Sequence, residues 1–322
     1  MRVGLIGVGR WGSAYLRTLQ SLAPRVHLTH VGTRHPERAG SLPARVAVYR
    51  DWRRLVRADC DAVIIATPPA THATMLQACL EARKPCIVEK PLRLDLATAE
   101  RLHRRVSRSR VPVLVNHLHL FHPAYRTLKR TLTKRREPIR RILCEGMGLG
   151  PFRLDTTALW DWGPHDLSLC LDLLGAAPRR VEALGGPRSA SGAPELASIH
   201  LDFAGGAAAW IQIGCLSPHK RRLLSVFTDT RLYVLDDAAR PQLTVRRFDF
   251  ARRYANQAPQ TRSASSLAPA SARSPLASAL TYFLDGLIGG DRTYFGTKLA
   301  LDVTRVLARC ESSIAKREAR HG

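Results

Sequence analysis

Val3-Gly4-Leu5-Ile6-Gly7-Val8-Gly9-Arg10-Trp11-Gly12 is the stretch of sequence that decides the fold of this chain. Its apolar first part is typical of a buried strand, and its second part is a G-x-G-x-x-G motif that opens a helical pattern from Ser13 to Leu22. A second apolar run, from Val26 to Val31, completes a strand–helix–strand unit. In this context the motif predicts a dinucleotide site rather than a glycine-rich turn without a ligand.

The three glycines of the motif have separate expected roles. Gly7 allows the tight turn, Gly9 lets the backbone approach a pyrophosphate, and Gly12 lets the helix pack closely on the strand. The helix N-terminus offers N–H groups and the positive end of its dipole to the anion. We therefore expect this loop, with Arg10 and Trp11, to bind the cofactor.

The end of the second strand indicates which dinucleotide is bound. An NAD site has an acidic residue about 20 positions after the motif, where it binds the ribose 2′-hydroxyl. Here the strand runs into Gly32-Thr33-Arg34-His35, and the first carboxylate is Glu37. Arg34 can pair with a 2′-phosphate and Thr33 can donate its hydroxyl to it, so the sequence favours NADP over NAD. The alternative is that Arg34 is one more solvated arginine.

Composition limits the class of protein. With 322 residues, the chain is long enough for two domains, and its 45% hydrophobic and 24% charged content is typical of a globular protein. No apolar run is long enough to span a membrane and the first strand begins at the N-terminus, so we expect no membrane segment, no signal peptide and a cytoplasmic location. The seven cysteines are scattered singly, which argues against a disulfide framework and a zinc site.

The charge of the chain is strongly positive, at +24, and basic residues concentrate in Arg101–Arg110 and Arg126–Arg141. A basic surface alone gives salt-dependent, non-specific binding of nucleic acid. These runs have helical patterns without interleaved aromatic residues for base stacking, so we interpret them as solvated helix faces and expect no specific nucleic-acid partner. The positive field favours an anionic cofactor and an anionic substrate.

Short apolar runs alternate with helical patterns through the first part of the chain, which predicts a doubly wound parallel sheet. After the first unit, these runs are Arg45–Tyr49, Asp61–Ala66, Cys86–Val88 and Val111–Val115. We expect an NAD(P)-binding domain of the Rossmann type over residues 1–120.

From about residue 140 the apolar runs lengthen and predict a second α/β domain built on a mostly antiparallel sheet. The runs are Ser198–Phe203, Ala207–Cys215, Leu223–Asp229 and Leu243–Phe250, with Gly205-Gly206 as a hairpin connection. The segment Ala255–Pro275 lacks periodicity and predicts a mobile loop. Helical patterns start at Leu276 and Thr297. We expect a substrate-binding and oligomerisation domain over residues 121–322.

Two motifs stand where parallel strands end, which is the edge of the sheet that borders a ligand crevice. Glu89-Lys90-Pro91 ends the fifth predicted strand, so Lys90 is expected to face the cofactor, and the proline allows a cis peptide bond. Thr67-Pro68-Pro69-Ala70-Thr71-His72 follows the fourth, with Thr71 as the expected helix cap. His72 by itself is more typical of a structural histidine.

A third motif, Trp160-Asp161-Trp162-Gly163-Pro164-His165-Asp166, precedes an apolar helical run. Pro164 suits the first position of a helix, which would place His165 in the first turn with Asp161 just ahead of it. There the helix dipole would keep the imidazole neutral and ready to accept a proton, and Asp161 would orient it. The alternative is a packing histidine and a simple capping aspartate.

Together, these motifs resemble the Gfo/Idh/MocA oxidoreductase family. The resemblance rests on four ordered motifs and extends over essentially the whole chain; the four motifs are Gly7-x-Gly9-x-x-Gly12, Thr67-Pro68-Pro69-x-x-His72, Glu89-Lys90-Pro91 and Asp161-x-Gly163-x-His165. The family uses no metal and acts on inositols, aldoses, nucleotide sugars and other cyclic polyols. The resemblance implies a Rossmann domain, a nicotinamide cofactor and binding of that cofactor by Thr67, Pro68, His72, Glu89 and Lys90.

The resemblance also implies catalytic roles for Lys90, Asp161 and His165. Removal of hydride from a secondary alcohol needs a base for the hydroxyl proton, and the imidazole of His165 has a suitable intrinsic pKa. Lys90 would hydrogen-bond the substrate oxygen and stabilise developing negative charge.

The chain departs from the family pattern at the substrate site. The usual Asn-x-Arg-x-x-Pro is replaced by a segment in which His117, His119 and His122 precede Pro123. These histidines either replace the missing hydrogen-bond partners or line the domain junction, and a three-histidine metal site is disfavoured because no carboxylate ligand adjoins it.

The glycine-rich lead-in to Asp161 is replaced by residues 153–159. Arg153, Asp155 and Trp160 are therefore candidate substrate contacts, as are Lys90, His117, His119, Asp161 and His165. Trp160 and Trp162 either offer a sugar an apolar face or are core aromatics.

The sequence thus predicts an NAD(P)-dependent dehydrogenase or reductase acting on a secondary alcohol or ketone of a sugar, cyclic polyol or nucleotide sugar. Two alternatives are an NAD-dependent glycoside hydrolase that works through transient oxidation and a catalytically silent sensor of dinucleotide or sugar. Members of the family commonly form dimers or tetramers, and we expect a homo-oligomer.

Overall fold

The computed structural model describes residues 1–40, 42–150, 152–153, 156–189, 192–248 and 261–321. The chain forms two compact units: the first comprises Met1–Leu118 and Arg273–Thr304, and the second His119–Ala272 and Arg305–Gly322. The sequence predicts a single boundary near residue 120, whereas in the structure residues 273–304 return to the first unit.

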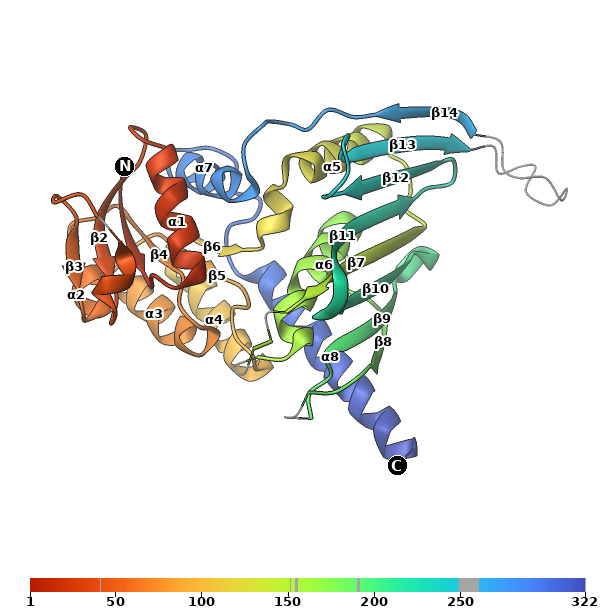
Figure 1. Ribbon diagram of the computed structural model, residues 1–322, viewed down its shortest axis with the longest axis horizontal. Helices are drawn as coiled ribbons and strands as arrows, with labels where there is room; N and C mark the ends of the chain where they lie inside the picture. Colours follow the sequence, from red (N-terminus) through yellow and green to blue (C-terminus); the bar gives the residue numbers. More distant parts are fainter. Residues whose placement is uncertain (41, 151, 154–155, 190–191, 249–260, 322) are drawn as a thin grey trace, which may run out of the picture. The chain divides into compact units, whose positions relative to one another are not determined.

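The first unit is built on a parallel sheet of six strands in the order β3-β2-β1-β4-β5-β6 (Figure 1). Its strands are β1 (Arg2–Ile6), β2 (His27–Gly32), β3 (Ala47–Tyr49), β4 (Ala62–Ile65), β5 (Cys86–Glu89) and β6 (Val113–Asn116). Every residue of β4, β5 and β6 is buried, because helices cover both faces of a parallel sheet. This order confirms the predicted doubly wound fold and places the topological switch point between β1 and β4.

Helices accompany the strands of the first unit, and two of them lie close to the helical patterns predicted from Ser13 to Leu22 and from Leu276. They are α1 (Arg10–Ser21), α2 (Trp52–Arg57), α3 (Pro69–Glu81), α4 (Leu96–Ser109) and α7 (Pro275–Leu287). Helix α7 packs against α1, far from it in the sequence (Figure 1). The helix α8 (Lys298–His321) starts in this unit and continues into the second.

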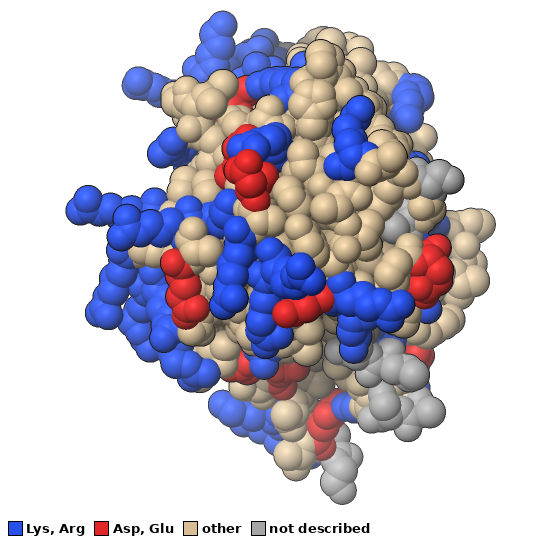
Figure 2. All heavy atoms as spheres, turned by 90° about the vertical axis from the view of Figure 1, so that its left-hand side faces the viewer, with Lys and Arg blue, Asp and Glu red and all other residues tan. Residues whose placement is uncertain are grey.

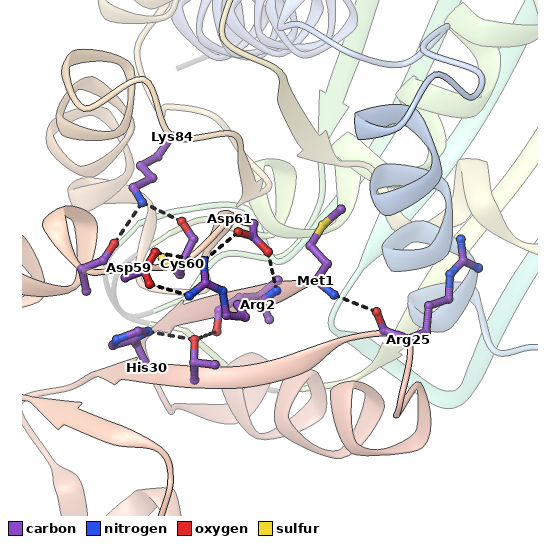
Figure 3. Close-up of polar contacts among 11 residues, drawn as sticks. Met1, Arg2, Arg25, His30, Asp59, Cys60, Asp61 and Lys84 are labelled. Atoms are coloured by element: carbon purple, nitrogen blue, oxygen red, sulfur yellow. Dashed lines mark hydrogen bonds and ion pairs between the residues drawn. The ribbon is translucent and has the colours of Figure 1, made fainter.

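Polar contacts fasten the amino-terminal edge of this sheet (Figure 3). The guanidinium of Arg2 pairs with both Asp59 and Asp61, the loop residues that precede β4. The ammonium of Lys84 donates to the carbonyl oxygen of Cys60 at 2.6 Å. These contacts join the starts of β1, β4 and β5 and stabilise the amino-terminal edge of the sheet. The residues of the candidate site lie at the opposite, carboxyl-terminal edge.

The second unit is built on a sheet of eight strands in the order β14-β13-β12-β11-β7-β10-β9-β8 (Figure 1). Its strands are β7 (Arg141–Leu149), β8 (Arg180–Gly185), β9 (Leu196–Asp202), β10 (Ala208–Gly214), β11 (Leu216–Phe227), β12 (Arg231–Asp236), β13 (Leu243–Phe248) and β14 (Thr261–Ser266). The pair β7–β10 is parallel and the other neighbours are antiparallel, which confirms the mostly antiparallel sheet.

Two expectations about the second unit have clear outcomes. Gly205 and Gly206 lie in the connection between the antiparallel strands β9 and β10, as predicted, and both have positive φ. The expectation of a loop over Ala255–Pro275 is wrong for 261–266, which form β14, because pairing with β13 supplies the backbone hydrogen bonds that a weak local pattern does not indicate. Residues 249–260 lie outside the described part.

The helices α5 (Pro123–Arg135) and α6 (Ala158–Leu174) pack on the sheet of the second unit. The basic runs lie mostly on α4 and α5 as expected, but the second run continues past α5 and ends at Arg141, the first residue of β7. On α4 the buried positions are Ala99, Leu102 and Val106, and the arginines take the exposed positions between them. Figure 2 shows a face on which Lys and Arg side chains greatly outnumber Asp and Glu.

The seven cysteines are all buried and free of disulfides, so they act as small apolar core residues. In the described part of the chain, no helix combines the length and the apolar character needed to cross a membrane.

Candidate functional site

The loop between β1 and α1 has the conformation that its three glycines were expected to give. Gly7 has φ +95°, and a Cβ there would lie 2.8 Å from the carbonyl oxygen of Ala66, at the end of β4. A Cβ at Gly12 would lie 2.0 Å from the carbonyl oxygen of Gly7. Apart from Gly9 itself, its chain neighbours and the backbone of its own helix, no described atom lies within 4 Å of the Cβ position at Gly9.

Gly9 is also the N-cap of α1, and no side chain caps this helix. The first turn of α1 thus presents its N–H groups beside open space at the switch point of the sheet, which fits the pyrophosphate of a dinucleotide. Arg10 is exposed and Trp11 half-buried at the same turn.

The residues that follow β2 lie at the same carboxyl-terminal edge. Thr33 is buried, and its backbone N–H donates to the carbonyl of Tyr49 at 2.9 Å. The Thr33 hydroxyl oxygen accepts a hydrogen bond from the N–H of His35 at 3.0 Å. This bond uses a lone pair of the oxygen and does not use the O–H group as a donor. Arg34 is exposed to solvent next to it.

His72 joins the ends of two neighbouring strands. Its imidazole is fully buried, with Nε2 2.8 Å from the carbonyl oxygen of Thr67 and Nδ1 2.9 Å from that of Pro91. These two contacts hold the loops after β4 and β5 together. The expectation that Thr71 caps the next helix is wrong, because α3 begins at Pro69 and Thr71 lies inside it, donating to the carbonyl oxygen of Pro68 at 2.8 Å.

A buried polar network stands at the ends of β5 and β6. The Tyr15 hydroxyl donates to Oε1 of Glu89, and the Asn116 amide donates to the same oxygen, both at 2.7 Å. Burial raises the pKa of Glu89. Among the described residues, Oδ1 of Asn116 has no hydrogen-bond partner although it is buried, so it offers a buried acceptor at the strand ends. Lys90, next along the chain, is 8% exposed.

The helix that carries Asp161 and His165 begins earlier than expected. Thr157 is its N-cap and accepts from the N–H of Trp160, so α6 starts at Ala158 and Pro164 lies inside it. The prediction that Pro164 starts the helix is wrong: the helix is capped by Thr157, and its packing on β7 and β10 includes the residues before Pro164 in it. His165 therefore lies beyond the first turn, where the field of the helix terminus has fallen off, and the dipole does not keep it neutral.

Asp161 and His165 are four residues apart on α6 and so lie on one face of the helix. Asp161 is 3.4 Å from the Arg153 guanidinium, so two of the candidate substrate contacts lie together. Trp160 is 4% exposed and its indole donates to Glu311 at 2.7 Å, which favours the core position among the two alternatives for this residue. Asp155 lies outside the described residues.

Three more histidines were candidates. His117 is buried at the end of the first unit. His119 lies in the second, with its ring perpendicular to that of His165 and the ring centroids 4.7 Å apart. His122 caps α5 and lies 2.9 Å from the Asp237 carboxylate. In the described part of the chain, no group of three or more His, Cys, Asp or Glu side chains is arranged to hold a metal ion.

Comparison with known proteins supports the reading of these motifs. Residues 1–117 match the model of an oxidoreductase family with an NAD-binding Rossmann fold, GFO_IDH_MocA, and residues 150–235 match the C-terminal domain model of the same family. The chain belongs to the Gfo/Idh/MocA family.

Two curated relatives of this family member carry enzyme names. UDP-N-acetylglucosamine 3-dehydrogenase of Acidithiobacillus ferrooxidans is 30% identical over 190 residues, 58% of each chain. Myo-inositol dehydrogenase Hyg17 of Streptomyces leeuwenhoekii is 32% identical over 208 residues, 62% of each chain. The matched part of the chain thus spans about three fifths of the length of these relatives.

Solved structures match this Gfo/Idh/MocA protein over nearly its whole length. A crystal structure from Magnetospirillum magnetotacticum MS-1 has a TM-score of 0.85 and 34% identity, covering 96% of this chain and 99% of the other. The UDP-N-acetylglucosamine 3-dehydrogenase structure from Acidithiobacillus ferrooxidans has a TM-score of 0.83 at 23% identity, covering 98% and 97%, which shows a shared fold.

Four residues of this Gfo/Idh/MocA chain were missed by sequence reasoning. Tyr15 and Asn116 complete the hydrogen-bond network of Glu89. Asn116 could have been identified from the sequence, because it pairs in register with Glu89 at the ends of two neighbouring strands. Arg222 and Asp237 have no local motif. Arg222 pairs with the buried Asp166 carboxylate at 3.1 Å, and both fill the space where a Cβ at Gly146 would stand.

The raised pKa of Glu89 leads to a test of the buried network. A carboxyl whose pKa is raised by folding contributes stability below its ordinary value of 4.5, and this contribution is lost as pH rises. In Glu89→Gln, the amide oxygen can still accept from Tyr15 and Asn116 without becoming charged. We expect the melting temperature of Glu89→Gln, relative to wild type, to increase as the pH is raised above 4.5.

The matched control is Glu81→Gln on the exposed end of α3, which should melt like wild type at each pH. Thermal melts of the three proteins across the acid-to-neutral range make the comparison. A melting temperature of Glu89→Gln that falls relative to wild type as the pH rises, or that does not change relative to it, would contradict the assignment.

Proposed function

We propose that this protein transfers hydride between a nicotinamide cofactor and a secondary alcohol or ketone of a sugar, cyclic polyol or nucleotide sugar. The observation that carries the proposal is the glycine loop, where open space at Gly9 meets the first turn of α1 at the switch point of the sheet. Membership of the Gfo/Idh/MocA family and the dehydrogenase names of two relatives support the proposed substrate class.

The nicotinamide, when bound, accepts or supplies the hydride. Gly7, Gly9 and Gly12 let the backbone of the loop receive the pyrophosphate. Lys90 hydrogen-bonds the substrate oxygen and stabilises its negative charge, and the buried Glu89 carboxyl beside it is held in place by Tyr15.

His165 removes the proton of the substrate hydroxyl during oxidation and returns it during reduction. Its partner on the same helix face, Asp161, orients the substrate or the imidazole and is itself held by Arg153. Lys90 belongs to the first unit, and Asp161 and His165 belong to the second.

The experiment that tests this function is a screen of inositols, aldoses, sugar acids and sugar nucleotides, each with NAD and with NADP. Reduction of the cofactor, followed by its absorbance, is the expected result with at least one class of secondary alcohol. Bound cofactor with no net reduction, or release of a sugar from a glycoside, would contradict the proposal.

We further propose that NADP(H) binds more tightly than NAD(H). Arg34 is exposed at the end of β2, beside the Thr33 hydroxyl, where an NAD-specific protein has a carboxylate. Arg34→Ala is expected to weaken NADP(H) binding by about tenfold or more, because a charge-assisted hydrogen bond to the 2′-phosphate is lost, and to leave NAD(H) binding unchanged.

Titration of both cofactors by fluorescence measures this change. Arg38→Ala is the matched control, since Arg38 is an exposed arginine four positions further along and should affect both cofactors equally and weakly. Equal weakening of both cofactors by Arg34→Ala would contradict the 2′-phosphate contact.

A further inference from the structure

We propose that a basic groove of the second unit, between strand β8 and the carboxyl-terminal part of α8, binds a small molecule that carries a chain of linked phosphate groups. The groove has a volume of about 470 Å³, which is the size of a small-molecule site. Its described lining residues all belong to the second unit, and they are not among the residues of the proposed catalytic and cofactor sites. The inference therefore goes beyond the proposed hydride transfer and does not depend on it.

Helix α8 carries two neighbouring stripes of different character. The first consists of buried apolar residues at helical spacing: Val303, Val306, Leu307, Cys310 and Ile314. The second lines the groove and consists of basic and hydroxyl side chains, also at helical spacing: Arg309, Ser312, Ser313, Lys316, Arg317 and Arg320. The helix thus packs into the core through one stripe and lines the groove with a row of cations through the other.

Strand β8, the last strand in the order of its sheet, forms the opposite wall and is hydrogen-bonded to the helix. The Ser313 hydroxyl accepts from the N–H of Ala183 at 2.9 Å and donates to the carbonyl oxygen of the same residue at 3.3 Å. The Arg309 guanidinium donates to the carbonyl oxygens of Pro178 and Arg179, both at 2.8 Å. These bonds fix the two walls relative to each other, so a ligand finds a preformed site and little has to be ordered on binding.

The charges of the groove do not balance. Five of the described lining side chains are basic and one, Glu182, is a carboxylate, which leaves an excess of four positive charges. Glu182 accepts from Arg180 at 2.5 Å and lies 3.6 Å from the Arg317 guanidinium, so two cations share one carboxylate. Lys316 and Arg320 are exposed, and neither has an ion pair or hydrogen bond with another described residue. The groove therefore attracts a ligand with several negative charges.

The acidic residues of α8 nearest to the groove have partners elsewhere. Glu311 accepts from the Trp160 indole at 2.7 Å, and Glu318 pairs with Arg188. Lys316 and Arg320 stand about one turn apart on the helix, where like charges repel each other. An anion bound between them removes this repulsion, and their charges are not compensated by a carboxylate of the same helix.

Linked phosphates fit this arrangement better than other anions do. A guanidinium group binds two phosphate oxygens with its planar fork of N–H groups, and the groove has four of these groups. A chain of phosphates can contact several of the cations along the helix at once, whereas a single phosphate engages fewer of them. The described lining contains no aromatic side chain on which a base of single-stranded nucleic acid could stack, so a small ligand is favoured.

The test titrates the full chain with inorganic triphosphate by calorimetry at low salt. The double variant Lys316→Gln/Arg320→Gln removes two exposed groove cations, and its dissociation constant for triphosphate is expected to rise about tenfold or more, because two charge-assisted contacts are lost. Since the two charges repel each other, the melting temperature should be at or above that of wild type.

The matched control is Arg130→Gln/Lys134→Gln on α5. It removes the same two kinds of charge, at the same spacing, from exposed positions of the second unit. This variant should bind triphosphate like wild type. Equal weakening by both double variants would show a diffuse effect of surface charge and overturn the site, as would the absence of triphosphate binding or an equal affinity for single phosphate.

Two further ligands identify the source of the phosphates. ATP can also bind at the glycine loop, so only the part of its binding that the groove variant loses is assigned to the groove. A larger loss for ATP than for triphosphate indicates a nucleotide, and an equal loss indicates the phosphate chain itself. A DNA duplex that binds more tightly than triphosphate and loses this binding in the groove variant would overturn the small ligand. None of these titrations needs turnover, so the groove and the proposed function fail separately.

Discussion

His165→Asn is expected to lower kcat on the order of 10²- to 10⁴-fold, because asparagine cannot take the proton of the substrate hydroxyl. The melting temperature should remain near that of wild type. The His165 ring is half-buried, and its backbone carbonyl, which accepts the Ser168 hydroxyl at 2.8 Å, is retained in the variant. Steady-state kinetics and thermal melts on the same preparations give both values.

The matched control is His200→Asn. His200 is also a half-buried histidine of the second unit, but its ring stacks on Trp210 in the sheet, with the centroids 4.9 Å apart. This variant should keep the wild-type kcat. If His165→Asn folds normally and turns over an identified substrate near the wild-type rate, the histidine is not the base.

Lys90→Met is expected to lower kcat about 10²- to 10³-fold, because the charge that stabilises the developing alkoxide is removed. Cofactor affinity should change little, since the pyrophosphate is expected at the glycine loop and not at the end of β5. Cofactor titration and steady-state kinetics separate the two effects.

Lys84→Met provides the opposite control in the same unit. Lys84 lies at the amino-terminal edge of the sheet, where its ammonium donates to the carbonyls of Ala58 at 2.9 Å and Cys60 at 2.6 Å (Figure 3). Its replacement removes both hydrogen bonds, although the Ala58 carbonyl keeps the bond from the N–H of Cys60 at 2.9 Å, and should lower the free energy of unfolding by about 1–3 kcal/mol without changing kcat. Equal kcat values for the two variants would argue against a role of Lys90 in the chemistry.

The fold of the first unit could be predicted well because short stretches of sequence determine its strands and its glycine loop. Each strand of the parallel sheet is a short apolar run, and the roles of Gly7, Gly9 and Gly12 follow from one motif. The start of α6 was misjudged because two local preferences compete there: Pro164 is favoured at the first helical position, and Thr157 is favoured as the N-cap. Such a conflict is resolved by the packing of the whole helix on β7 and β10.

Other features could not be read from local pattern. Strand β7 alternates between exposed and buried residues, but it contains Gly146 and Gly148 and begins within a basic stretch of sequence, so its hydrophobic pattern is weak. The contacts of His119 with His165 and of His122 with Asp237 join segments distant in the sequence, and only the folded sheet brings them together.

The two-segment make-up of the first unit has a consequence for its synthesis on the ribosome. The ion pair of Arg25 with Asp285 and the hydrogen bond of His103 to Thr297 at 2.9 Å form only after nearly the whole polypeptide has emerged. During synthesis, the side of α1 that packs against α7 therefore stays uncovered until the second sheet has been synthesised and α7 has emerged. During that interval, chaperones can bind this uncovered surface of α1, and neighbouring nascent chains can associate through it.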